Sequence, residues 1–248
     1  MNPITRRRFI KAGVTAAVGA SGVAAVDRIA RRYGLIPPDA GTLYGPGETL
    51  TYATQRLFMR HTLAHEYSRS QISQPPFPNE IGKLSDEYKR MEQARFRDWR
   101  LNVDGLVAEP GSFSMAEIRS FPVRSQITMV ACEEGWSYVA EWTGAPLSHL
   151  LKLVGAKPEA RYVIYRSIQK EWWESIDVDE AKHPQTLLTY AMNDRDLPVA
   201  SGGPLRLRVP RQLGYKSVKF ITHLTVADKV PGLGGLASDV GYAWYAGI

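Results

Sequence analysis

The sequence of 248 residues contains one cysteine, Cys132. A single thiol forms no internal disulfide, so the fold does not depend on an oxidising compartment. The chain also has no set of cysteines for an iron–sulfur cluster and no CxxCH motif for attached haem. The CxxC and HExxH patterns of common zinc sites are missing as well. Several ordinary metal and redox centres are therefore excluded.

Acidic residues are scarce at the start of the chain, and this scarcity explains the formal net charge of +6. Residues 1–32 carry seven basic residues and one acid, so the remaining residues are neutral overall. The basic charge belongs to an N-terminal leader. It does not indicate a nucleic-acid-binding surface, and no nucleic-acid partner is expected.

A long hydrophobic run is also missing, since the most apolar stretch, Ala12–Val26, is short and rich in glycine and alanine. A membrane span needs about 20 apolar residues. The stretch follows the basic motif "TRRRFIK" at residues 5–11, and this pattern resembles a twin-arginine export signal. We therefore expect a periplasmic protein carried by the twin-arginine export machinery, and anchored to the membrane if the leader is not cleaved. Because this route exports folded proteins, often with a cofactor inserted, a cofactor is expected.

Composition divides the chain into a signal segment at residues 1–32, a Pro- and Gly-rich extended linker at 33–50, and one domain at 51–248. Helix signals begin at Ser85, at Ser114 with its capping-box Glu117, and at Pro146. Short strand-like segments fill most of the remainder. A strand pair is predicted about a turn at Asp104 and Gly105. We therefore predict an α+β domain dominated by mixed or antiparallel β structure.

The surroundings of Cys132 leave several roles open. Glu133 and Glu134 follow it directly and oppose the thiolate that a nucleophilic cysteine needs. His61 and His65 are four residues apart and would share a helix face, which is a weak signal for a zinc hydrolase. From composition alone, Cys132 is as well explained as a small buried apolar residue.

Longer motifs around Cys132 carry a resemblance to a known family. They are "CEEGWSYVAEWTGAPL" from Cys132, "HPQTL" from His183, "GGPLR" from Gly202 and "LGYKSVK" from Leu213. Over about residues 96–228 this sequence resembles the molybdopterin-binding domain of the sulfite oxidase family, and in particular its exported branch that includes protein-methionine-sulfoxide reductases. The resemblance implies the sulfite-oxidase-type fold, β-rich with flanking helices.

The resemblance also implies the cofactor, Mo-molybdopterin, with Cys132 as a thiolate ligand to molybdenum. A high-valent metal deprotonates a coordinating thiol despite acidic neighbours. Around Arg206, apolar and cationic residues alternate, so one face of a strand would carry positive charge toward the cofactor phosphate. The expected cofactor contacts are Arg60, His61, Ser167, Ser201, Arg206, Ser217, Val218 and Lys219.

The implied activity is oxygen-atom transfer, most simply the reduction of a small or protein-bound sulfoxide such as methionine sulfoxide. Electrons would come from an external carrier, a haem membrane subunit or a cytochrome, since the chain has no second redox site of its own. Glu133 to Trp136 stand where sulfite oxidases usually carry a Gly-Asn-Arg segment that helps bind an anion, which ranks sulfite oxidation second. A cofactor-free binding protein on the same scaffold is the alternative of another class.

Overall fold

The structure is a computed structural model that describes most of the chain, including every strand named below. The described residues are 25, 28–30, 34–42, 45–74, 82–169 and 171–248. The twin-arginine motif and nearly all of the expected leader lie outside them. Among the described residues, no helix is both long enough and apolar enough to cross a membrane.

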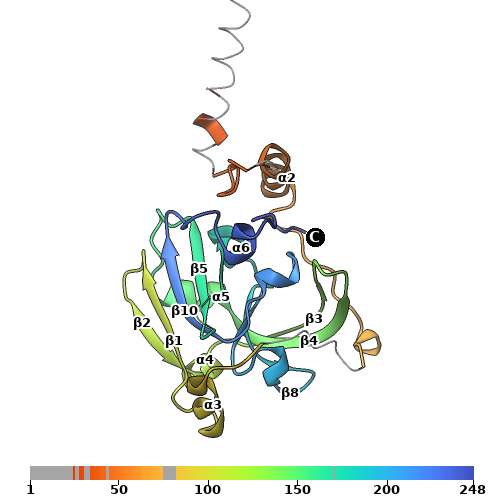
Figure 1. Cartoon of the computed structure of the whole chain (residues 1–248), viewed down its shortest axis with the longest axis vertical. Helices are drawn as coiled ribbons and strands as arrows, with labels where there is room; N and C mark the ends of the chain where they lie inside the picture. The colour runs from red at the N-terminus through yellow and green to blue at the C-terminus, as the bar shows by residue number, and fades with distance from the viewer. Residues whose placement is uncertain (1–24, 26–27, 31–33, 43–44, 75–81, 170) are drawn as a thin grey trace, which may run out of the picture.

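The chain forms two five-stranded sheets (Figure 1). The first has the order β2-β1-β10-β5-β6, with a parallel pair between β1 and β10 and antiparallel pairs elsewhere. Its strands are β1 Arg100–Gly105, β2 Gly111–Ser114, β5 Tyr162–Ser167, β6 Trp173–Asp177 and β10 Ile221–Ala227. The second sheet is antiparallel, in the order β3-β4-β7-β8 with β9 also paired to β7. Its strands are β3 Arg124–Ala131, β4 Ser137–Pro146, β7 Leu187–Met192, β8 Arg195–Asp196 and β9 Arg206–Arg208.

Short helices flank the two sheets. The α-helices are α2 Gly45–Phe58, α3 Asp86–Gln93, α4 Met115–Ser120, α5 Leu147–Leu153, α6 Val178–Ala181 and α7 Leu236–Asp239. Three 3-10 turns are η1 Arg69–Gln71, η2 Val199–Ser201 and η3 Gly214–Lys216. The predicted N-caps hold, because Ser85 accepts from the Tyr88 amide and Ser114 forms the capping box with Glu117. The α+β class is confirmed.

The main core lies where strands of both sheets meet α5. Leu205, Leu207 and Val209 along β9 are fully buried in it, together with Leu150 and Leu151 of α5. The alternation along β9 therefore has the predicted consequence: its apolar side chains face this core, and the intervening arginines point to the other side.

Two expectations about local structure are corrected. Gly105 does not form a hairpin turn; it ends β1, and a side chain there would collide with the Val226 carbonyl of the adjacent β10. Glycine is required by this close approach, and the antiparallel partner of β1 begins only at Gly111. The second correction is that α2 starts at Gly45, inside the range expected to be an extended linker.

The C-terminal segment, residues 243–248, packs against the rest of the domain and hydrogen-bonds to it. Trp244 and Tyr245 pack against Tyr52 of α2, with ring centroids 5.6 and 5.1 Å from that of Tyr52. The Leu213 amide donates to the Ala246 carbonyl at 2.9 Å, and the Ile248 amide donates to the Arg211 carbonyl at 3.0 Å. The segment therefore supports residues 211–213, which lead into η3.

Candidate functional site

Cys132 lies at the tip of the β3–β4 hairpin, directly after the last residue of β3. Its amide donates to the Trp136 carbonyl at 2.9 Å, and its carbonyl accepts from the Gly135 amide at 3.1 Å. Gly135 has φ +89°, which only glycine adopts readily. The tight turn therefore fixes the backbone of Cys132 at the hairpin tip.

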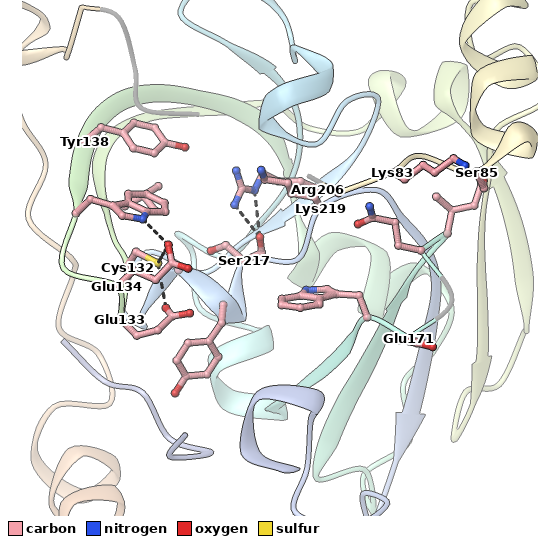
Figure 2. A pocket seen from close by; sticks show the side chains of 18 of the residues that line it. Lys83, Ser85, Cys132, Glu133, Glu134, Tyr138, Glu171, Arg206, Ser217 and Lys219 are labelled. Carbon is pink, nitrogen blue, oxygen red and sulfur yellow. Dashed lines mark hydrogen bonds between the residues drawn. The ribbon is translucent and has the colours of Figure 1, made fainter. Parts of the chain in front are cut away.

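The hairpin tip forms one wall of a cavity of about 620 Å³, a volume typical of sites for small ligands and cofactors (Figure 2). Other walls come from the start of α3, from the segment after β5, from β9 and from the η3 turn with the residues after it. The lining includes Lys83, Ser85, Glu87, Cys132, Glu133, Glu134, Trp136, Tyr138, Gln169, Glu171, Trp172, Arg206, Tyr215, Ser217 and Lys219.

The Cys132 thiol is protonated in this setting. Burial raises the pKa of Cys132 to about 12, and the carboxylates of Glu133 and Glu134 add to the rise. The Cys132 Sγ–H donates to Glu133 Oε2 at 3.3 Å. A nucleophilic cysteine requires the opposite arrangement, with a cation beside the sulfur. A sulfur of this kind becomes a thiolate when a metal ion coordinates it.

Two arginines of β9 are buried at one wall of the cavity. Arg206 lines the cavity, and Arg208 lies two residues further along the strand. The Arg206 guanidinium donates to the Ser217 carbonyl from Nε and Nη2 at 3.2 and 2.8 Å, and to the Ser201 carbonyl at 3.0 Å (Figure 2). Arg208 donates to the Thr128 hydroxyl, the Met129 carbonyl and the Ser217 hydroxyl. Both guanidinium groups lie over the Trp142 ring, at 5.2 and 5.4 Å from its centroid.

These arginines carry charge that no carboxylate of the described residues neutralises, since their partners are carbonyls, hydroxyls and an aromatic ring. Burial lowers the pKa of Arg208 to about 9 and also lowers that of Arg206. Arg208 Nε is buried without a hydrogen-bond partner. An unneutralised buried cation is costly unless an anion comes to it. Arg206 therefore indicates an anion-binding wall.

Lys219 adds a further cation to the same wall. Burial, and then the neighbouring Arg206, lower the pKa of Lys219 to about 7. Its Nζ donates to the Ala200 carbonyl at 2.7 Å. Gly202 lies against the Lys219 side chain, where a Cβ would come within 2.8 Å of Lys219 Cβ, so the backbone closes tightly around the stem. A bound anion would favour the charged ammonium and so raise this pKa.

The η3 turn is held from below by a buried ion pair. Lys216 Nζ lies 2.6 Å from Glu174 Oε2, and both side chains are almost fully buried. Glu174 Oε1 also accepts from the Ala237 amide at the start of α7. The pair thus ties β6 and α7 to the turn that presents Tyr215 and Ser217 to the cavity.

Four of the predicted site residues line the cavity together: Cys132, Arg206, Ser217 and Lys219. Three others lie behind its wall. The Ser201 carbonyl accepts from Arg206, the Ser167 hydroxyl accepts from the amide of the lining residue Gln169 at 3.1 Å, and Val218 belongs to the main core. Their roles as cofactor contacts stay predictions.

The structure does not bring Arg60 and His61 to this cavity. They line a separate hollow beside the end of α2, and Arg60 is paired with Asp179 at 2.7 Å. The physical reason is that α2 packs on the C-terminal segment and on α6, away from Cys132. The histidine pair also lacks its helix, because α2 ends at Phe58. Among the described residues there is no cluster of three or more potential metal-binding side chains.

Sequence reasoning missed several lining residues. Trp136, just before β4, and Tyr138, within it, stack with ring centroids 6.0 Å apart. Their spacing of two along an extended chain is the signal that could have placed them beside Cys132. Lys83 and Glu87 come from a part of the chain far from the hairpin. No local pattern signals that position.

Comparisons with known proteins identify the family of the chain. The family model described as oxidoreductase molybdopterin binding domain matches residues 88–232, more than half of the chain. A putative protein-methionine-sulfoxide reductase subunit, YedZ1 of Azospira oryzae, is 38% identical over 191 residues, which cover 77% of this chain and 70% of that protein.

Two Xanthomonas proteins, from X. campestris and X. axonopodis, are named protein-methionine-sulfoxide reductase catalytic subunit MsrP. Each is 35% identical over 162 residues, 59% of this chain, and the match spans half of the relative's length. The crystal structure of the sulfane dehydrogenase SoxCD from Paracoccus pantotrophus aligns with a TM-score of 0.55 at 22% identity. That alignment covers 72% of this chain and 46% of the SoxCD chain, and supports a shared fold.

Proposed function

The chain belongs to the oxidoreductase molybdopterin-binding family, and from this membership we propose that it reduces a sulfoxide, most simply methionine sulfoxide, by oxygen-atom transfer. It is an oxidoreductase, its cofactor is Mo-molybdopterin, and the resemblance read from its motifs is confirmed. The observation that carries the proposal is the shared cavity wall of Cys132, Arg206 and Lys219. The substrate rests on the names of the relatives, of which the Xanthomonas proteins match over only half their length.

The residues of the cavity fit this cofactor. The Cys132 sulfur faces the cavity as the one protein thiolate that molybdenum would need, with the remaining sulfurs supplied by the pterin. Arg206 and Lys219 present cations to the cofactor phosphate, and Arg206 has no competing carboxylate among the described residues. Ser217 lies between them as a polar neighbour. The volume of about 620 Å³ accommodates a cofactor and leaves an open side for a substrate.

The reaction is balanced by two electrons and two protons, which convert a sulfoxide to a sulfide and water. When bound, Mo-molybdopterin supplies a metal centre that accepts an oxygen atom and exchanges the two electrons. The chain's own residues bind and orient the reactants. Trp172 and Trp136 offer apolar surface to the organic part of the sulfoxide. Glu133 and Glu134 lie beside Cys132 Sγ, where each carboxylate can take a proton from solvent and pass it to the oxygen that leaves as water.

The charges of the cavity favour a neutral sulfoxide over the sulfite anion. The carboxylates of Glu133 and Glu134 lie at the hairpin tip beside the sulfur, and Glu87 and Glu171 also line the cavity. Negative charge at this position raises the cost of bringing an anion to Cys132. Arg206 and Lys219 in the cavity wall are assigned above to the cofactor phosphate.

Cellular context is part of the same proposal. The leader motif at residues 5–11 supports export by the twin-arginine route to the periplasm. A membrane protein or a cytochrome would then supply the electrons, because the chain lacks cysteine motifs for a second redox centre. The domain would extend from about residue 51 to the end of the sequence.

One purification tests the proposed function. We expect protein exported by cells that make molybdopterin to contain about one molybdenum per chain, by elemental analysis. With a reduced dye as electron source, it should convert free and peptide-bound methionine sulfoxide to methionine, and it should oxidise sulfite much more slowly. Folded protein without molybdenum would support a cofactor-free binding protein instead. Faster sulfite oxidation than sulfoxide reduction would reverse the order of the two substrates.

A further inference from the structure

Exposed apolar side chains gather on and just after α2. We call Leu50, Leu57, Phe58, Met59 and Leu63 the α2 patch. Phe58 is 79% exposed and Leu50 is 71% exposed, and all five rank among the exposed large hydrophobic residues of the described part of the chain. Scattered single residues of this kind are normal on a protein surface, whereas a contiguous group indicates an interaction site.

The α2 helix directs large apolar side chains outward, which is the reverse of an ordinary surface helix. Tyr52 and Arg56, four residues apart, face the body: Tyr52 is 3% exposed, and Arg56 pairs with Asp177 at 2.9 Å and with Asp179. Leu50, Leu57 and Phe58, at positions i, i+7 and i+8, share the outward side. Surface helices normally bury their apolar side against the core. Because Tyr52 and Arg56 fix the helix, its outward apolar side is a stable feature of the fold.

The location of the patch favours one occupant. The apolar run Ala12–Val26 is joined to α2 by a short stretch of chain, and Asp39 within that stretch accepts from the Trp244 amide at 2.6 Å, next to Tyr52. The stretch that follows the apolar run in the sequence is therefore attached to the body beside α2. Any membrane that holds this run lies within reach of the patch.

The charge of the N-terminal segment and the shape of the α2 patch also favour a membrane as the occupant. Residues 1–32, which precede α2 in the chain, carry seven basic residues and one acid, whereas Arg56 and Arg60 of the α2 region are paired with Asp177 and Asp179. Side chains as exposed as Phe58 and Leu50 protrude, so they suit a fluid interface better than a preformed protein pocket. Protruding apolar residues that follow a basic segment of the chain suit the surface of an anionic bilayer.

We propose that the α2 patch docks the protein onto an anionic phospholipid bilayer, with α2 lying in the interface. This inference does not depend on the sulfoxide activity. Its consequence is a fixed orientation of the catalytic domain on the membrane. Tyr215, which lines the cavity, donates to the Ala243 carbonyl of the same C-terminal segment that packs under α2, so the docked end is structurally continuous with the cavity wall.

The test compares two sets of substitutions in the full, cofactor-loaded chain. The patch variant is Leu50→Ser, Leu57→Ser and Phe58→Ser together. The matched control is Val123→Ser with Leu153→Ser, because these residues are 60% and 50% exposed and lie outside the patch. Co-flotation with vesicles of phosphatidylcholine, with and without phosphatidylglycerol, measures the partition coefficient of each protein.

We expect the parent and the control to float with vesicles, more strongly when phosphatidylglycerol is present, and the patch variant to partition at least about tenfold less. Circular dichroism and dye-dependent activity should match in all three proteins, and Phe58→Ser alone replaces the triple variant if that variant does not fold. Equal partition of patch variant and parent would overturn the proposal, because the leader would then account for all binding. Self-association through the patch without vesicles, or binding only to vesicles that contain membrane protein, would overturn it too.

Discussion

Replacing Cys132 with serine is expected to reduce sulfoxide reductase activity by more than about a hundredfold, since replacing a residue that merely orients a metal ligand already costs about 10–100-fold. The hydroxyl is a harder and far less acidic ligand than the thiol. The hairpin should stay intact, because main-chain bonds of Cys132 with Trp136 and Gly135 hold the tip. Activity with a reduced dye, molybdenum content and the thermal unfolding midpoint give the three measurements.

A matched control lies on the same hairpin. Ser125 at the start of β3 is exposed, and its hydroxyl is hydrogen-bonded to the Thr143 hydroxyl. Ser125 lies at the opposite end of the strand from Cys132. Ser125→Ala should retain activity and molybdenum. If Cys132→Ser turned over sulfoxide at the rate of the parent, the sulfur would have no role as a metal ligand, and the proposed chemistry would need another centre.

Replacing Arg206 with alanine is expected to lower the molybdenum content of the purified protein by about 10–100-fold at limiting cofactor. Hydrogen bonds to charged groups contribute about 1.5–3 kcal/mol, and each 1.4 kcal/mol is a factor of ten in affinity. The lost guanidinium is the buried cation at the cavity wall, and its removal also leaves the Ser217 and Ser201 carbonyls without their donor. Elemental analysis and pterin fluorescence after release measure the occupancy.

Two further variants test whether the loss of molybdenum is specific to the Arg206 guanidinium. Arg206→Lys keeps the charge but loses the forked donor, so its occupancy should fall between parent and alanine variant. Arg60→Ala removes an exposed arginine from the hollow beside α2 and should leave the occupancy unchanged. Equal loss in Arg60→Ala and Arg206→Ala would contradict the anion-binding role of this wall, and would restore the N-terminal contact read from the sequence.

Signals confined to a few neighbouring residues predicted the local structure well. Ser114 and Glu117 form the expected capping box, and Ser85 begins its helix. The alternation about Arg206 placed leucines in the core and arginines opposite, because a strand exposes successive residues to opposite sides. In these cases the sequence within one element already contains the physical cause of the structure.

Contacts between distant segments were beyond such signals. Gly105 looks like a turn residue, yet it is required by the approach of β10, more than a hundred residues later in the chain. Arg60 and His61 were assigned to the cofactor from sequence resemblance alone, while the packing of Tyr52 on Trp244 directs α2 elsewhere. Lys83 reaches the cavity only because the fold brings the start of α3 beside it.

The packing of the C-terminal segment has a consequence for how the cavity would respond to proteolysis. Residues 243–248 hydrogen-bond to Arg211 and Leu213, immediately before the turn that presents Tyr215 and Ser217 to the cavity. Cleavage that removed these residues would take two main-chain hydrogen bonds from that wall. The Cys132 hairpin, whose tip is closed by its own main-chain bonds, would keep its shape, so one side of the cavity would loosen while the other stayed in place.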